Sequence, residues 1–159
     1  MRRDAIPADT RLAPNHIRVL VAESDTRLRS VLCWLLDDDG RFRVMGQAGT
    51  EDQVLACEAP FDVALIDLRL SGLGHLNVIG RLLQRDPVPV VVVLADTGVV
   101  YLRHAAAAEG AFAYLVRPAD LEHLGDRLAE LFELTPGELI DWSDAQTHRM
   151  ALCQHVDLG

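Results

Sequence analysis

Charged side chains stand at the ends of several apolar runs in the 159-residue chain, and their types could support chemistry. Glu23, Asp67 and Arg117 each end or directly follow such a run. Carboxylate oxygens are the ligands that Mg²⁺ prefers, and a guanidinium binds oxyanions. If the runs are neighbouring strands, the sequence predicts an acidic pocket for a metal ion, faced by a cation for the anion that the metal holds.

The apolar runs alternate with segments of helical spacing, which predicts the elements that must position these side chains. The runs are apolar throughout, and this is typical of parallel strands covered on both faces. Such a sheet binds ligands outside the carboxyl ends of its strands, where the three charged residues fall. The predicted fold class is therefore α/β, a doubly wound parallel sheet. We expect strands over 17–22, 42–47, 61–67, 88–94 and 111–116, and helices over 26–36, 51–58, 75–84, 99–109 and 120–134.

Local signals predict where two of the helices begin, end and pack. Gly40 is suited to end the first helix, because glycine adopts the left-handed conformation without strain. Asp120 is a candidate N-cap for the last helix. The first helix is expected to bury a stripe of apolar residues at helical spacing, namely Leu28, Val31, Leu32 and Leu35.

The strand–helix alternation predicts one domain over residues 17–134, with a segment on either side. Residues 1–16 are polar, contain two prolines and show no period, so we expect a flexible N-terminal arm. Residues 135–159 leave the alternation and are expected to be a C-terminal tail or the start of a missing output domain. We also expect apolar tail residues such as Trp142 to fold back onto the first helix beside Trp34.

Composition limits the classes of function. The formal net charge is −9 and no basic run is present, which argues against a surface for duplex DNA. The three cysteines, Cys33, Cys57 and Cys153, show no metal-ligand spacing and are expected to be reduced thiols. The N-terminus has no signal-peptide pattern, and the longest apolar stretch, 88–95, is too short to cross a bilayer. We therefore expect a cytoplasmic protein without a membrane partner.

Three segments together resemble the receiver domains of two-component response regulators. Residues 18–24 (RVLVAES) are similar to the family's first strand and acidic pair. Residues 61–73 (FDVALIDLRLSGL) are similar to the strand and loop around its phosphoaccepting aspartate, and residues 110–118 (GAFAYLVRP) to its final strand. The resemblance runs over residues 17–134 in the family's order. It implies a flavodoxin-like sheet of strand order 2-1-3-4-5.

The resemblance implies a phosphorylation site that holds Mg²⁺. Asp67 would accept a phosphoryl group from a histidine kinase as a carboxylate nucleophile. The metal would be held by Asp67, by Glu23 mainly through water, and by the backbone carbonyl of Arg69. Ser24 occupies the position of the family's second acidic residue, which is a direct metal ligand.

The resemblance also implies a switch region beside this site. Arg117 would face the phosphoryl oxygens in place of the family's Lys, and the Arg117–Pro118 bond is a candidate for the cis form that is common in the family. Tyr114 would be the switch aromatic. Ala95 occupies the position of a Thr or Ser whose hydroxyl hydrogen-bonds the phosphoryl group.

Three substitutions depart from the family's pattern. Ser24 removes a negative charge from the pocket, so the affinity for Mg²⁺ should fall. Ala95 offers a methyl group in place of the hydroxyl, and Thr97 is expected to be misplaced for that role. Arg117 keeps the charge of Lys but differs in shape and hydration. Asp25 could replace Ser24 only through a shift of register that would misplace the apolar stripe of the first helix.

We therefore expect an atypical, non-enzymatic receiver domain that acts through protein contacts, with weak or absent phosphorylation of Asp67 and weak Mg²⁺ binding. Its expected partners are a histidine kinase or another regulatory protein, and a second copy of the chain. The predicted homodimer face is formed by the fourth helix, fifth strand and fifth helix. At the start of that fourth helix, residues 99–102 (VVYL) offer more apolar surface than one buried stripe requires.

The main alternative is the receiver part of a DNA-binding transcriptional regulator that uses conventional aspartyl phosphorylation. Residues 134–139 (LTPGEL) faintly resemble the opening of a LuxR-type output domain, and only such a domain would bind DNA. A phosphatase of the haloacid-dehalogenase type is disfavoured, because Arg69 stands where its second Asp is needed. A dinucleotide-binding domain is disfavoured because residues 23–26 contain no glycine.

Overall fold

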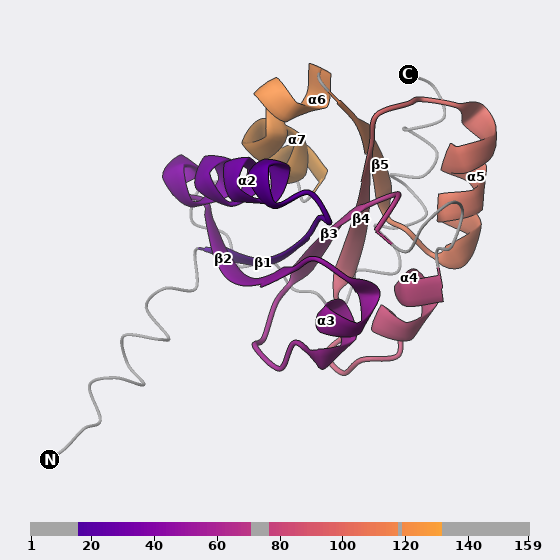
Figure 1. Cartoon of the computed structure of the whole chain (residues 1–159), viewed down its shortest axis with the longest axis horizontal. Helices are drawn as coiled ribbons and strands as arrows, with labels where there is room; N and C mark the ends of the chain where they lie inside the picture. Colours follow the sequence, from indigo (N-terminus) through magenta and orange to yellow (C-terminus); the bar gives the residue numbers. More distant parts are fainter. Residues whose placement is uncertain (1–15, 71–76, 118, 132–159) are drawn as a thin grey trace, which may run out of the picture.

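A five-stranded parallel sheet forms the centre of the molecule, as the sequence predicts. The computed structural model describes residues 16–70, 77–117 and 119–131. The strand order is β2-β1-β3-β4-β5 and every pair is parallel, which confirms the predicted topology (Figure 1). The strands are β1 (Ile17–Ala22), β2 (Phe42–Ala48), β3 (Val63–Asp67), β4 (Val90–Ala95) and β5 (Ala113–Val116).

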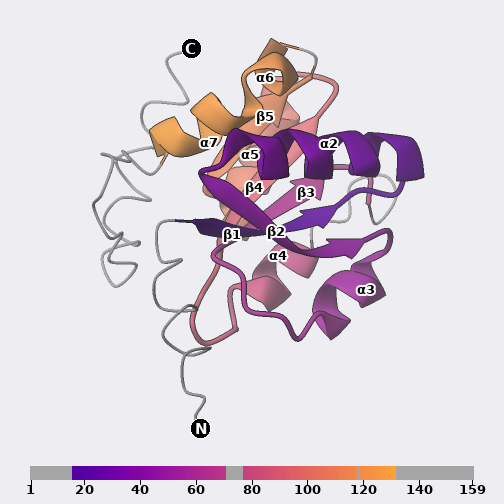
Figure 2. The same cartoon turned by 90° about the vertical axis from the view of Figure 1, so that its left-hand side faces the viewer.

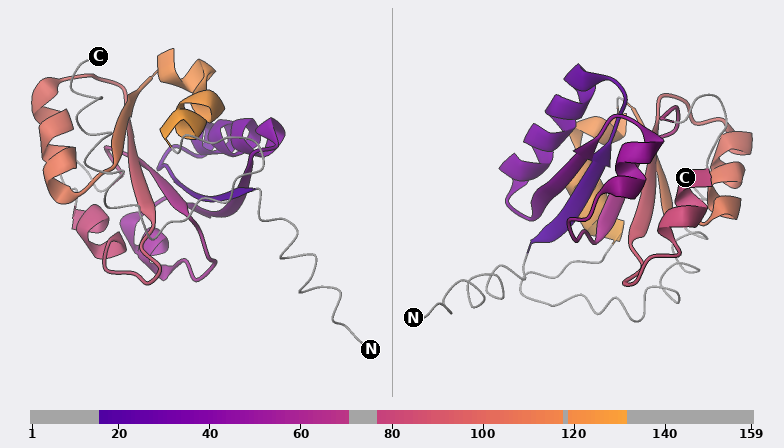
Figure 3. Two further views of the ribbon diagram at one scale, coloured as in Figure 1. Left: turned by 180° about the vertical axis from the view of Figure 1, so that it is seen from behind. Right: turned by 60° about the horizontal axis from the view of Figure 1, so that its bottom comes forward.

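Helices cover both faces of this sheet. One face carries α2, α6 and α7, and the other carries α3, α4 and α5 (Figures 1 and 2). The view from behind shows the same layers, with the sheet between the indigo and orange helices on one side and the helices from magenta to salmon on the other (Figure 3). The helices are α2 (Thr26–Asp39), α3 (Glu51–Ala56), α4 (Asn77–Leu82), α5 (Val100–Glu109), α6 (Ala119–Glu122) and α7 (Leu124–Leu131).

Two hydrophobic clusters, one on each face, explain why the strands are apolar at every position. Val19 and Val21 of β1 belong to the cluster beneath α2 and α7. Leu20 and Ala22, which alternate with them, belong to the cluster beneath α3, α4 and α5. Each fully buried Leu, Ile or Val contributes about 1.5–3 kcal/mol, so both faces stabilise the sheet.

The first helix differs from its prediction in length and in the face that it buries. It continues to Asp39 and ends at Gly40, whose φ of 84° is the left-handed conformation expected of a glycine terminator. The buried residues are Leu32, Cys33 and Leu36, whereas Val31 is 46% exposed. The predicted stripe is confirmed at Leu32, and Leu28 packs against the same cluster, but Val31 is exposed and Cys33 and Leu36 are buried in addition. The helix packs against both the sheet and α7, which rotates its buried face toward Cys33 and Leu36.

The last predicted helix is two helices, α6 and α7, on either side of His123. The carbonyl of His123 accepts a hydrogen bond from the Arg127 amide at 2.8 Å and opens α7. Asp120 lies inside α6, so its prediction as the N-cap is wrong. β3, β4 and β5 each begin two residues later than predicted, since regular pairing starts only where neighbouring strands overlap. Residues 132–134 lie outside the described part of the chain.

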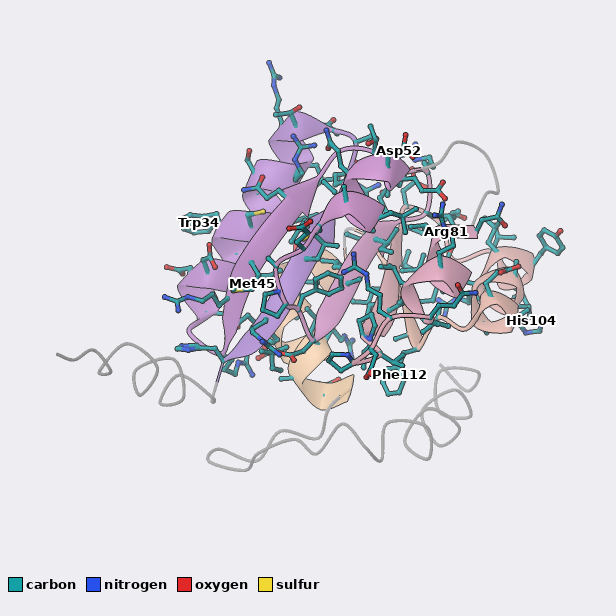
Figure 4. The ribbon with its side chains drawn as sticks, turned by 90° about the horizontal axis from the view of Figure 1, so that it is seen from below. Trp34, Met45, Asp52, Arg81, His104 and Phe112 are labelled. Atoms are coloured by element: carbon teal, nitrogen blue, oxygen red, sulfur yellow. The ribbon has the colours of Figure 1, made fainter. Side chains whose placement is uncertain are left out.

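Several expectations fall on residues that the structure does not describe. These are the flexible arm over 1–16 except His16, the tail over 135–159, its docking on the first helix, and Pro118 with its peptide bond. They stay predictions, as do the domain boundaries. Trp34, the predicted docking point, is 64% exposed and projects from α2 away from the sheet (Figure 4). Within the described ranges, no helix is long and apolar enough to cross a membrane.

Candidate functional site

Two buried carboxylates lie at the carboxyl ends of neighbouring strands. Glu23 directly follows β1 and Asp67 is the last residue of β3, and the two strands pair up to Ala22 and Ile66. Glu23 is 3% exposed and Asp67 is 4% exposed, and they are the buried charged residues of the described chain. Carboxylates are rarely buried unless they are paired, so this end of the sheet is the candidate site.

Asp67 is held by a guanidinium on its buried side and by a backbone amide. Arg117, which follows β5, places Nη2 3.2 Å from Asp67 Oδ2 and has a side chain only 14% exposed. The Arg69 amide donates to Asp67 Oδ1 at 2.7 Å. The carboxylate is therefore fixed in orientation by two donors that approach different oxygens. A fixed, charge-paired carboxylate is suited to act on an electrophile or to bind a cation.

Glu23 has one carboxylate oxygen that is bonded and one that is not. Oε1 accepts a hydrogen bond from the Asp25 amide at 2.9 Å. Oε2 is buried without a hydrogen-bond partner among the described residues. Burial raises the pKa of the Glu23 carboxyl; the Asp25 N–H lowers it in part, and the nearby Asp67 carboxylate raises it again. The free oxygen is a natural ligand for a cation or a water molecule at this site.

Neither Ser24 nor Asp25, the two residues after Glu23, supplies the second acidic ligand expected of the family. Ser24 is exposed, and its hydroxyl lies 3.5 Å from Glu23 Oε1. Asp25 is the N-cap of α2: its Oδ1 accepts from the amides of Arg27 and Leu28 at 2.8 and 3.1 Å. These N–H donors, with Leu28 the stronger, lower the pKa of Asp25. Capping therefore occupies this carboxylate, which is a simpler reason than the shift of register for why Asp25 does not replace Ser24.

The end of β4 brings an exposed ion pair over the site. Ala95 is buried and its methyl group offers no hydrogen bond. Asp96, the next residue, places Oδ2 3.2 Å from Nη1 of Arg69, and Nε of Arg69 lies 4.0 Å from Asp67 Oδ1. The sequence predicts a role for the backbone carbonyl of Arg69 but none for its side chain, and it assigns no contact to Asp96. The one signal in the sequence was the position of Asp96 directly after a strand.

Tyr114 is buried and tied to the loop that follows β4. Its hydroxyl donates to the carbonyl of Thr97 at 2.8 Å. The guanidinium of Arg103 lies over its ring at 5.3 Å from the centroid. Burial raises the pKa of the Tyr114 hydroxyl, so it stays a hydrogen-bond donor at neutral pH. Thr97 thus contacts Tyr114 through its backbone, and its hydroxyl is not part of this hydrogen bond.

The comparisons with known proteins agree with this arrangement. The model of the response regulator receiver domain family matches residues 19–129, which contain both carboxylates and Arg117. The chain belongs to this family. It therefore has the receiver fold of two-component signalling, and the resemblance inferred from its three motifs is confirmed.

Curated relatives of this receiver are longer proteins with different names. Response regulator GacA of Pseudomonas aeruginosa is 32% identical over 122 residues, which cover 73% of this chain and 55% of that protein. A protein-glutamate methylesterase/protein-glutamine glutaminase of Paramagnetospirillum magneticum is 31% identical over 69% of this chain, but the match spans only 32% of its own length. The matched part is the receiver region, so the name of that enzyme assigns no activity to this chain.

Solved structures show the same fold at lower identity. A response regulator from Thermotoga maritima superimposes with a TM-score of 0.63 at 24% identity and covers 72% of this chain and 96% of its own. A beryllofluoride-activated receiver domain, DrrB, gives a TM-score of 0.63 at 19% identity over 75% and 99% of the two chains. At these identities the likeness concerns the fold. The roles of Asp67, Glu23, Ser24, Arg69, Ala95, Tyr114, Arg117 and Pro118 stay predictions.

Proposed function

We propose that this receiver regulates its target mainly through protein contacts, with weak or absent phosphorylation of Asp67. The observation that carries the proposal is the shortage of acidic ligands beside Glu23. Ser24 is exposed and carries no negative charge, and Asp25 caps α2. The described residues contain no group of three or more His, Cys, Asp and Glu side chains that could hold a metal ion. Two carboxylates, Glu23 and Asp67, remain for a divalent cation.

A magnesium ion fits this site only in part. Glu23 Oε2 and the Asp67 carboxylate are suitable oxygen ligands, and we propose the Arg69 carbonyl as a third. When bound, Mg²⁺ neutralises charge on the transferred phosphoryl group. The two carboxylates leave the ion one negative charge short of an ordinary receiver. We therefore propose weak Mg²⁺ binding.

The chain's own groups would position a phosphoryl group on Asp67 incompletely. Arg117 neutralises Asp67 and can face an incoming oxyanion, since its buried Nε has no hydrogen-bond partner among the described residues. Ala95 cannot donate a hydrogen bond to that oxyanion. A hydrogen bond to a charged group is worth about 1.5–3 kcal/mol, so this loss alone should weaken the phosphorylated state substantially.

A phosphorylation assay tests the proposal. The wild type, Ser24→Asp/Ala95→Thr and Asp67→Asn are incubated with Mg²⁺ and acetyl phosphate, and covalent phosphate is measured by intact-protein mass spectrometry. We expect slow, partial uptake by the wild type, uptake at least about tenfold faster in the double variant, and none in Asp67→Asn. Fast, stoichiometric uptake by the wild type would contradict the proposal and favour a conventional phosphorylation cycle.

The second candidate is the receiver part of a transcriptional regulator that uses conventional phosphorylation. Its support is that relatives named as regulators, such as GacA and the transcriptional regulatory protein TcrA of Mycobacterium tuberculosis, extend well beyond the matched region. Such a protein would act in the cytoplasm, receive its phosphoryl group from a histidine kinase, and bind DNA only through an output domain. The same assay separates the two candidates, because this one requires fast uptake by the wild type.

A further inference from the structure

One side chain, Arg69, connects the phosphoacceptor to the loop over residues 96–99 that joins β4 to α5. Its guanidinium lies between two carboxylates, 4.0 Å from Asp67 Oδ1 through Nε and 3.2 Å from Asp96 Oδ2 through Nη1. Asp67 therefore has a guanidinium on each side, with Arg117 buried beneath it and Arg69, 56% exposed, at the mouth. The Arg117 side chain is 14% exposed and that of Arg69 is 56% exposed, so the Arg69 guanidinium has more room to change partners.

The loop over 96–99 also contacts the switch aromatic. Thr97, next to Asp96, accepts the hydrogen bond from the Tyr114 hydroxyl at 2.8 Å. A continuous series of contacts thus runs from Asp67 through Arg69, Asp96 and Thr97 to Tyr114. A direct contact between an anion on Asp67 and the end of β4 is not available, because the methyl group of Ala95 cannot donate a hydrogen bond.

We propose that Arg69 is the group that couples the phosphoacceptor to this loop. In the free protein the Arg69–Asp96 ion pair holds the loop over 96–99 in place. An oxyanion seated at Asp67 adds negative charge beside Arg69, draws the guanidinium away from Asp96, and releases the loop with Tyr114 and the start of α5. The ion-pair step stands by itself, and only the release step depends on the proposed function, because it needs an anion at Asp67 and the proposed function expects such an anion to be held only weakly.

The ion pair is exposed, so its effect is modest and sensitive to salt. Arg69 and Asp96 are 56% and 50% exposed. Exposed pairs of this kind contribute about 0.2–1 kcal/mol, which corresponds to about a 1.5- to 5-fold change in an opening equilibrium. Screening at high ionic strength should remove most of that change.

Hydrogen exchange on the free protein tests the ion-pair step without any phosphodonor. The amides of residues 97–100 are followed by NMR in the wild type, Arg69→Gln, Asp96→Asn and the double variant. We expect each single variant to speed exchange by about 1.5- to 5-fold and the double variant to match a single one, with the differences lost in 1 M NaCl. Arg69→Lys should retain part of the protection, because it keeps the charge.

Arg81→Gln is the matched control. Arg81 is an exposed arginine in the last turn of α4 (Figure 4), and no ion pair joins it to Asp96 among the described residues. Its removal should leave the exchange of residues 97–100 unchanged. Loop exchange that is unaffected by both Arg69→Gln and Asp96→Asn would overturn the ion-pair step, and so would effects of the two that add.

Beryllofluoride with Mg²⁺, a non-covalent mimic of a phosphoryl group, tests the release step. Binding is read at the Arg69 amide, which donates to Asp67 Oδ1. We expect bound wild type to reach the loop exchange of free Arg69→Gln, with a shift of the Tyr114 ring signal in protein labelled at its two tyrosines. Arg69→Gln should bind without further loosening of the loop.

Slower loop exchange in wild type that has bound beryllofluoride, or an equal response in Arg69→Gln, would each overturn the release step. The proposed function is judged separately, by covalent phosphate uptake of the wild type. The ion-pair step can therefore fail while phosphorylation is weak, and it can hold while phosphorylation is fast.

Discussion

At the scale of single residues, the two buried carboxylates of the site differ in how their negative charges are compensated. Asp67 is paired with Arg117, so its negative charge is compensated inside the protein. Arg29 donates to the backbone carbonyl of Glu23 at 2.7 Å, but among the described residues the Glu23 carboxylate has no ion pair and its Oε2 has no hydrogen-bond partner. The free energy that Glu23 costs the folded state should therefore be measurable without any ligand.

Replacing Glu23 with Gln should stabilise the metal-free protein at neutral pH. The pKa of Glu23 is raised by burial, so the folded state binds this proton more tightly than the unfolded state. The protonated Glu23 carboxyl therefore contributes fully to the free energy of unfolding below its ordinary pKa of 4.5. This contribution is lost as the pH rises through the raised pKa of the folded state. At pH 7 in EDTA, Glu23→Gln should raise the free energy of unfolding by about 1 kcal/mol, because a neutral amide avoids burying a negative charge beside Asp67.

Urea unfolding from pH 4 to pH 8 checks this prediction. The gain from Glu23→Gln should shrink toward pH 4, where the wild-type carboxyl is also neutral. Glu58→Gln removes an exposed carboxylate and should change the free energy of unfolding little across the range. A loss of stability in Glu23→Gln at pH 7 would mean that the Glu23 carboxylate is better compensated than its contacts indicate.

At the scale of elements, the contact between α2 and α7 depends on one glycine. Gly125 lies against Asp39, whose carboxylate is fixed by Arg41 through bonds of 2.6 and 2.7 Å. Arg41 also donates to Asp126 of α7 at 2.8 Å, so one guanidinium joins the end of α2 to α7. A side chain at position 125 would meet the Asp39 carboxylate directly, and that carboxylate is not free to move away.

Gly125→Ala should therefore destabilise the protein although alanine is the better helix former. We expect a loss of about 1–3 kcal/mol, the usual cost of forcing atoms into a packed contact. Gly80→Ala in α4 is the control, because a methyl group there meets only Glu109 Oε2 at 3.9 Å. That change should gain about 0.5–1 kcal/mol. Chemical denaturation gives the free energy of unfolding of both variants. An equal increase in both would show that α7 can shift away from α2.

At the scale of the whole molecule, exposed apolar side chains gather at the start of α5. Val99, Val100 and Tyr101 are 50%, 64% and 76% exposed. Their position agrees with the predicted homodimer face, whose fourth helix, fifth strand and fifth helix are α5, β5 and α6 with α7 in the structure. This face stays a proposal. A second exposed apolar position, Trp34, lies on α2 across the sheet from α5 (Figures 1 and 4).

We expect the chain to form a dimer at micromolar concentration through the surface that contains Tyr101. Tyr101→Asp places a charge in that interface and should weaken association by at least about tenfold, since a central aromatic commonly contributes 2 kcal/mol or more. Trp34→Asp is the matched change on the other face and should leave association intact. Analytical ultracentrifugation gives the constants. A monomeric wild type would remove the proposal, and sensitivity to Trp34→Asp alone would move the interface to α2.

Local sequence patterns were enough to predict the sheet and the edge at which the site lies. Strands that are apolar at every position must be covered on both faces, and that local property predicted the α/β class and the position of Glu23 and Asp67 at strand ends. The strand order was implied only by the family resemblance. Gly40 and its left-handed conformation were also predictable, because the requirement is local. These features depend on a few consecutive residues.

Packing between segments that are distant in the sequence set how their side chains share partners. It rotated the buried face of α2 toward Cys33 and Leu36, because α2 packs against α7 as well as the sheet. It divided the last helix at His123. It also placed the Arg69 side chain between Asp67, at the end of β3, and Asp96, directly after β4, a contact that no spacing in the sequence reveals. Periodicity predicts which face of an element is apolar, but a charged side chain takes the partner that the packing of distant segments brings within reach.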